Sequence, residues 1–116
     1  MRAGLIVVPV AALVAGCTGG APADGLPCAA TIAAADQLMN TGKAPRDPTV
    51  NDEGVLALAT HVNVWAIPKR LPEKEAYATV LAERDRLVAG STPPAQVMQQ
   101  ARQCVTRAQA MLKRMG

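Results

Sequence analysis

Apolar residues recur at steps of three and four positions along nearly the whole chain after Pro27, and this spacing constrains the fold more than any other feature. Such steps place residues on one face of an α-helix. Prolines and glycines divide the pattern into segments of helix length, since proline cannot continue a helix and glycine favours a helix end. The sequence therefore predicts an all-α fold, a small bundle of about four short helices.

The expected helices cover residues 27–42, 49–68, 72–90 and 92–115. Thr49 and Asp52 resemble a capping box at the start of the second helix, and Thr92 is placed to cap the fourth. The β-branched residues between His61 and Ile67 would also suit a short strand, but no second strand is visible to pair with it.

Each expected helix has an apolar face that would pack into the core. In the four helices in turn, these faces contain Cys28, Ile32, Ala35, Leu38 and Met39; Val55, Leu58, Val62 and Trp65; Tyr77, Val80, Leu81, Leu87 and Val88; and Val97, Ala101, Cys104, Ala108, Met111 and Met115. The fourth helix is the most clearly amphipathic of them.

The first seventeen residues have the form of an export signal. Arg2 precedes an apolar run from Leu5 to Ala15, which is only about half the ~20 residues needed to span a bilayer. The run ends in Leu13-Val14-Ala15-Gly16-Cys17, which resembles the lipobox of bacterial lipoproteins, with Val14 where leucine is commonest.

Membership of the lipoprotein class implies that Cys17 is lipidated and that residues 1–16 are removed. Residues 17–25, rich in glycine and proline, would then be a flexible tether and residues 26–116 the helical domain. Thr18 rather than Asp follows the cysteine, which implies an outer membrane address facing the periplasm. The alternative is cleavage after Ala23 by the general signal peptidase, which would release a soluble protein.

Either route removes Cys17 from pairing and leaves Cys28 and Cys104 on the apolar faces of the first and fourth helices. Small exported domains commonly use such a pair as a disulfide. Closing a loop of this length would contribute about 4.5 kcal/mol of stability in the chain-entropy model. This contribution to stability matters because the core must be thin: the chain has no Phe, and its only aromatic residues are Trp65 and Tyr77.

Candidate catalytic and metal-binding residues are few. We expect His61, the only histidine, to stack on Trp65 or face solvent, since no Ser, Cys or carboxylate is placed to form a relay with it. Asp52 and Glu53 suit a helix start better than acid–base catalysis. The cysteines lack a C-x-x-C motif, and Met39, Met98, Met111 and Met115 suit core packing better than copper binding. No catalytic residue, metal site or cofactor is therefore predicted.

The charges suggest a membrane or protein partner rather than a nucleic acid. The net charge is +3, too small and too scattered for a nucleic-acid site. Arg102, Arg107, Lys113 and Arg114 make the last helix basic, which suits a helix C-terminus or an anionic partner. The charges from Glu83 to Arg86 suit a solvated helix face.

The sequence favours a non-catalytic, lipid-anchored envelope protein that binds an unidentified protein partner or supports envelope structure. One alternative is a soluble stress chaperone, because the plan is similar in outline to that of periplasmic acid-stress chaperones. A small enzyme or metal carrier is the third possibility.

Overall fold

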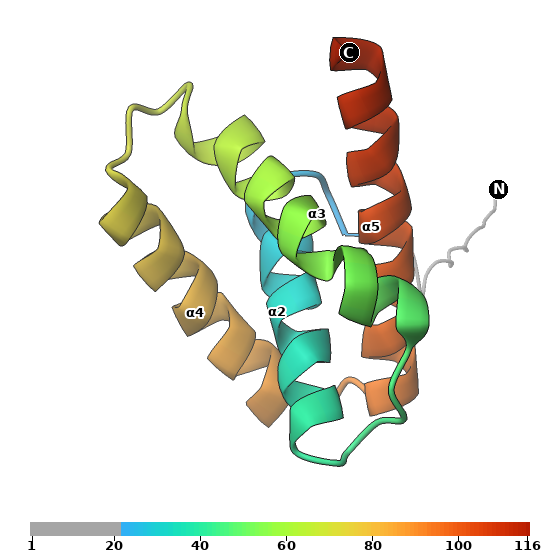
Figure 1. Cartoon of the computed structure of the whole chain (residues 1–116). Helices are drawn as coiled ribbons and strands as arrows, with labels where there is room; N and C mark the ends of the chain where they lie inside the picture. Colours follow the sequence, from blue (N-terminus) through green and yellow to red (C-terminus); the bar gives the residue numbers. More distant parts are fainter. Residues whose placement is uncertain (1–21) are drawn as a thin grey trace, which may run out of the picture.

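The computed structural model describes residues 22–116, which form four α-helices and no strand. They are α2 (Leu26–Asn40), α3 (Pro48–Ala66), α4 (Glu73–Ala89) and α5 (Pro94–Met115), arranged as in Figure 1. The predicted all-α bundle is confirmed, and the segment from His61 is helical rather than a strand. The predicted leader, the lipobox and Cys17 lie outside the described residues.

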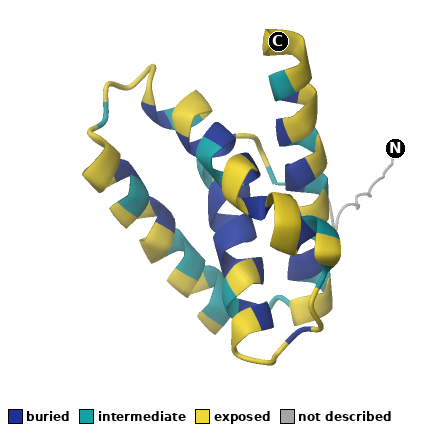
Figure 2. Ribbon diagram, viewed as in Figure 1, coloured by how far each residue is buried: buried dark blue, intermediate teal, exposed yellow. Residues whose placement is uncertain are grey.

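Helix α2 is the centre of the bundle and packs against each of the other three helices. It is buried on almost all sides, whereas the outer faces of its neighbours are exposed (Figure 2). Five alanines occupy its buried surface: Ala29, Ala30, Ala33, Ala34 and Ala35. Their small side chains let three helices approach one axis, so the alanine-rich composition accounts for a central helix.

The predicted N-cap of α3 is wrong by two residues. Asp47, not Thr49, is the N-cap, and its side chain accepts a hydrogen bond from the Val50 N–H. Pro48 occupies the first turn, where its missing N–H costs nothing. Helix α5 likewise begins at Pro94 after Pro93, so Thr92 does not cap it.

Glycines lie at or just beyond two helix ends, as predicted. Gly42 follows α2 with a left-handed φ of 75°, which glycine adopts without strain. This turn lets the Lys43 N–H donate to the Leu38 carbonyl oxygen. Gly90 is the C-cap residue of α4.

The predicted apolar faces are correct for α2 and largely correct for α5. The α5 face is buried from Val97 to Met111, but Met115 is 76% exposed because the end of the helix extends past its neighbours (Figure 1). In α3 the predicted face is wrong at Val55, which is 83% exposed. The buried face instead contains Val50, Gly54, Ala57, Thr60, His61, Val62 and Ala66.

Helix α4 lies at the edge of the bundle. It packs on α2, contacts α3 only slightly, and does not pack directly on α5 within the described chain. Of its predicted apolar side only Val80 is fully buried, and Leu81 is 43% exposed. The predicted apolar side was too wide, because a helix that packs mainly on one neighbour buries only a narrow stripe.

None of the helices in residues 22–116 is long and apolar enough to cross a membrane.

Candidate functional site

His61 lies on α3, fully buried, and both of its ring nitrogens bond to the backbone of other segments. The Gly25 N–H donates to Nδ1 at 3.1 Å, and Nε2 lies 2.8 Å from the Cys104 carbonyl oxygen. Since Nδ1 accepts, the ring proton is assigned to Nε2, which donates to Cys104. The expectation that His61 faces solvent is wrong. Helix α3 turns the ring inward, where it links the start of α2 to the middle of α5.

The N-cap position of α2, residue 25, requires a glycine. Its φ is 89°, and a Cβ built there would lie 3.0 Å from the Cβ of Trp65. Any larger residue would push the chain away from Trp65 and lengthen the hydrogen bond to His61. The close approach of Gly25 to α3 therefore depends on the absence of a side chain.

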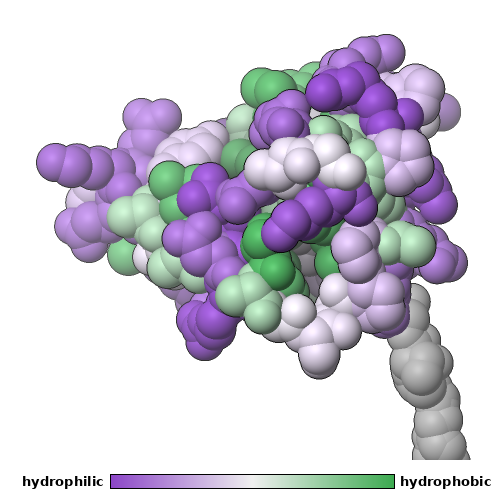
Figure 3. Space-filling view, turned by 90° about the horizontal axis from the view of Figure 1, so that it is seen from below, coloured by the Kyte–Doolittle hydropathy of each residue, from purple (hydrophilic) through white to green (hydrophobic). Residues whose placement is uncertain are grey.

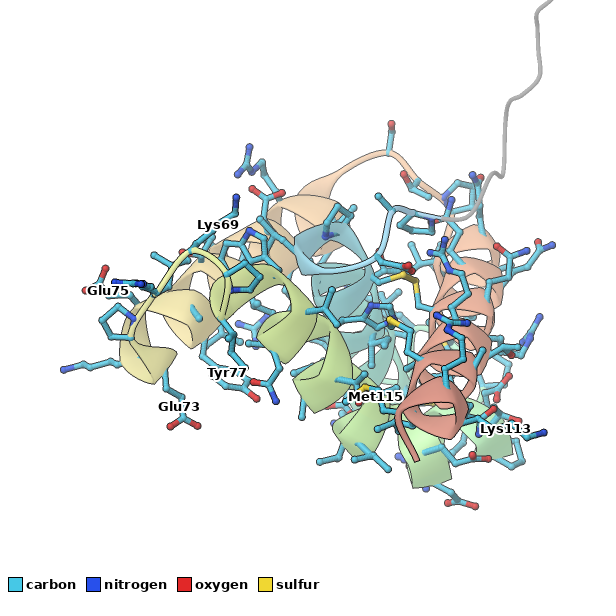
Figure 4. All side chains as sticks on the ribbon, turned by 90° about the horizontal axis from the view of Figure 1, so that it is seen from above. Lys69, Glu73, Glu75, Tyr77, Lys113 and Met115 are labelled. Atoms are coloured by element: carbon cyan, nitrogen blue, oxygen red, sulfur yellow. A yellow bond between two sulfur atoms is a disulfide. The ribbon has the colours of Figure 1, made fainter. Side chains whose placement is uncertain are left out.

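The sulfur atoms of Cys28 and Cys104 lie 2.13 Å apart, at disulfide distance, with their Cα atoms 5.4 Å apart. Both residues are fully buried, and the bond joins α2 to α5 (Figure 4). The carbonyl that His61 contacts belongs to Cys104, so the disulfide and the histidine hold the same point of α5.

Arg107 lies one turn after Cys104 and covers the disulfide. Its Nη2 donates to Cys28 Sγ at 2.8 Å and also to the Pro22 carbonyl oxygen. Its Nε lies 3.3 Å from Asp24 Oδ1 in an ion pair, although the N–H is not aligned for a hydrogen bond. Residues 22–25, at the end of the expected tether, therefore lie against the bundle.

We call Asp24, Cys28, His61, Cys104 and Arg107 the junction cluster. Ligand atoms of Asp24, Cys28 and His61 all lie within 4.8 Å of one another. The sequence predicts the pairing of the two cysteines but not their contact with Asp24, His61 and Arg107, which long-range packing brings together. One available signal was the spacing of Gly54, Ala57 and His61, which continues the buried face of α3.

A surface groove of about 230 Å³ lies where α3 and α4 diverge above α2. Its apolar lining residues include Ile32, Ala33, Val50, Val55, Leu58 and Leu81. Asp36 and Arg84 add one charge of each sign. Figure 3 shows the bundle from below, with apolar and hydrophilic side chains mixed over that face.

The remaining charged candidates lie in surface interactions. Glu53 accepts a hydrogen bond from Gln109, and Glu83 pairs with Arg86. Arg102 donates to Asp47 at 2.6 Å, which links α5 to the cap of α3. None of these groups contacts His61, whose two nitrogens are both occupied by backbone groups.

The Asp47 carboxyl should make folding stability depend on pH. Burial alone would raise its pKa, but hydrogen bonds from Arg102 and the Val50 N–H, with the charge of Arg102, lower the pKa below its ordinary value of 3.8. Because the pKa is lower in the folded state, the ionised carboxylate stabilises the fold fully above the unfolded-state pKa of about 3.8. This contribution is lost as the pH falls through the folded-state pKa.

Asp47→Asn retains a good N-cap and removes the charge, so we expect a loss of about 1 kcal/mol at pH 7 that is smaller at about pH 3, below the ordinary pKa of 3.8. Urea unfolding at both pH values measures it. Asp36→Asn, which changes an exposed carboxylate on α2, is the matched control and should show little difference. A loss for Asp47→Asn that is equal at both pH values would contradict the assignment.

Comparison of the chain with protein-family models, curated proteins and solved structures finds no match.

Proposed function

We propose that the protein is a small exported lipoprotein that acts without catalysis, by binding a helix of another envelope protein in the groove between α2, α3 and α4. The apolar leader and the lipobox ending at Cys17 support the envelope address. Acyl chains on Cys17 would anchor the domain stably, at about 0.8 kcal/mol per buried methylene. Thr18 favours the outer membrane, facing the periplasm.

The groove is the observation that carries the binding proposal. Val55 of α3 and Leu81 of α4, on opposite sides of it, are 83% and 43% exposed. Isolated exposed apolar residues are ordinary, but these two border a hollow with an apolar floor. This arrangement supports a binding site in which a partner protein would cover Val55 and Leu81.

An amphipathic helix is the occupant that fits this groove. At about 230 Å³ the groove is smaller than the ~300–1,000 Å³ typical of small-molecule sites, but it can receive anchoring side chains. A helix between α3 and α4 would also pack on α2 and so add a fifth member to the bundle. The opposite charges of Asp36 and Arg84 favour a partner with complementary charges beside its apolar stripe.

Lipidation of Cys17 is tested by labelling with fatty acid in a bacterium that processes lipoproteins. We expect label in the wild type and none in Cys17→Ser, because the thiol is the acylation site. Recovery of an unlabelled mature chain that begins at Asp24 would show that the general signal peptidase acts instead.

The groove is tested with a photo-cross-linking residue at position 81, on the groove rim, and at exposed position 99 on α5. We expect position 81 to link one envelope protein through a segment that mass mapping identifies as an amphipathic helix. Val55→Asp should reduce that product at least tenfold, whereas Val64→Asp, on the same helix but outside the groove, should change it less than twofold. Equal products at both positions would contradict the proposal, and links to many unrelated proteins would favour the stress chaperone.

A further inference from the structure

The junction cluster contains four side chains of the types that bind zinc in proteins. Asp24, Cys28 and His61 have ligand atoms within 4.8 Å of one another, and Cys104 Sγ is bonded to Cys28 Sγ. We infer that reduction of this disulfide converts the cluster into a site for one Zn²⁺ ion. The inference goes beyond the proposed function and does not depend on it.

Three of the four ligand atoms need only a small contraction. Zinc bonds of about 2.0–2.3 Å place tetrahedral ligands roughly 3.3–3.8 Å apart, so the ligand atoms of Asp24, Cys28 and His61, now within 4.8 Å of one another, need to close by at most about 1–1.5 Å. The fourth, Cys104 Sγ, is not part of that group, and it needs to move about 1.7 Å farther from Cys28 Sγ once the 2.13 Å bond is broken. Asp24 lies before α2 and is exposed, so its side chain can move without disturbing the core.

His61 already has the orientation of a metal ligand. Its Nε2–H donates to the Cys104 carbonyl, which fixes the tautomer and directs the Nδ1 lone pair toward Gly25, beside Asp24 and Cys28. Ligating histidines in proteins are usually held in this way, by a bond from the other ring nitrogen to a carbonyl or carboxylate. Zinc would replace the Gly25 N–H as the partner of Nδ1.

The charges balance in the reduced site. Two thiolates and the Asp24 carboxylate carry −3, Zn²⁺ leaves −1, and Arg107 neutralises the remainder from 2.8 Å beside Cys28 Sγ. A partly buried site with no net charge avoids most of the desolvation penalty of an isolated ion.

The chemistry begins with reduction by a phosphine. The phosphine takes oxygen from one water molecule and is oxidised to its oxide, the S–S bond breaks, and the two hydrogens of that water end on Cys28 and Cys104 as thiols. Binding of Zn²⁺ then releases both thiol protons to the buffer. The cluster would thus join α2 and α5 by a disulfide when oxidised and by a metal ion when reduced.

The test uses the full chain with Cys17→Ser, so that Cys28 and Cys104 are its only cysteines. We expect one Zn²⁺ per phosphine-reduced chain and none per oxidised chain. At free zinc of about 100 times Kd, the unfolding equilibrium constant of the reduced protein should fall about 100-fold. Because the chain has one histidine, nitrogen NMR of the imidazole shows directly whether Nδ1 binds the ion.

Asp24→Asn should weaken zinc binding at least tenfold in the reduced protein. Asp36→Asn, an exposed carboxylate on α2 away from the cluster, is the matched control and should leave it unchanged. Zinc bound without a shift of the Nδ1 resonance, equal binding to oxidised and reduced chains, or no binding would each overturn the inference. None of these outcomes bears on lipidation of Cys17 or on the groove.

Discussion

Replacing Cys104 with alanine is expected to lower the free energy of unfolding by about 2–5 kcal/mol, the usual loss when a small exported domain loses its disulfide. The bond joins the first turn of α2 to the middle of α5, across a sequence separation of 76 residues. Without the bond the unfolded chain has more conformational entropy, which folding must then overcome. For a domain of this size the melting temperature should fall by about 10 °C or more, which thermal unfolding by circular dichroism measures.

Two controls separate the cross-link from other effects. Phosphine reduction of the wild type, with a chelator present to exclude metal ions, should reproduce the loss without changing any side chain except the disulfide. Thiol counting on denatured, unreduced protein should find Cys28 and Cys104 linked within one chain. Two free thiols, or an unchanged melting temperature after complete reduction, would show that the bond does not stabilise the fold.

The helices could be predicted from the sequence because their signals are local. Prolines and glycines near each helix end and apolar steps of three and four fix where a helix forms, whatever it packs against. The errors at Thr49 and Thr92 arise where several residues compete to cap one helix. Asp47 has the advantage over Thr49 because Pro48 follows it and Arg102 pairs with it.

Which face of a helix is buried was harder to predict, because that depends on the number of neighbours. Leu81 and Val55 were expected in the core, but the divergence of α3 from α4 leaves both at the groove. Steps of three and four cannot show that α2 is the central helix and α4 an outer one. The abundance of alanine in α2 was the available signal for close packing on several sides.

The junction cluster could be predicted only in part. Cys28 and Cys104 were paired from their positions on two apolar faces, and the structure places them at bonding distance. His61 was expected to stack on Trp65 or face solvent, and Arg107 was expected to be one of the cations that make the last helix basic. In the structure His61 bonds to backbone groups of Gly25 and Cys104, and Arg107 to that of Pro22. No sequence pattern predicts such backbone partners.

His61→Ala is expected to lower the free energy of unfolding by about 3–5 kcal/mol. The Gly25 N–H and the Cys104 carbonyl would both lose a buried partner, and an unsatisfied buried polar group costs about 1–3 kcal/mol. The void left by the ring adds to this. Thr60→Ala is the matched control, since the adjacent Thr60 hydroxyl bonds only to the Leu56 carbonyl of its own helix, and its loss should cost about 1 kcal/mol or less.

Two further variants identify the source of the loss at His61. Asn at position 61 places an acceptor near the Nδ1 position and should recover part of the stability through Gly25. A double variant of His61→Ala and Cys104→Ala should lose less than the sum of the single losses, because both side chains hold the same point of α5. Chemical denaturation of the four proteins of this cycle measures the coupling. Strict additivity, or a His61→Ala protein as stable as the wild type, would mean that the two hydrogen bonds of the ring do not hold α2 and α5 to α3.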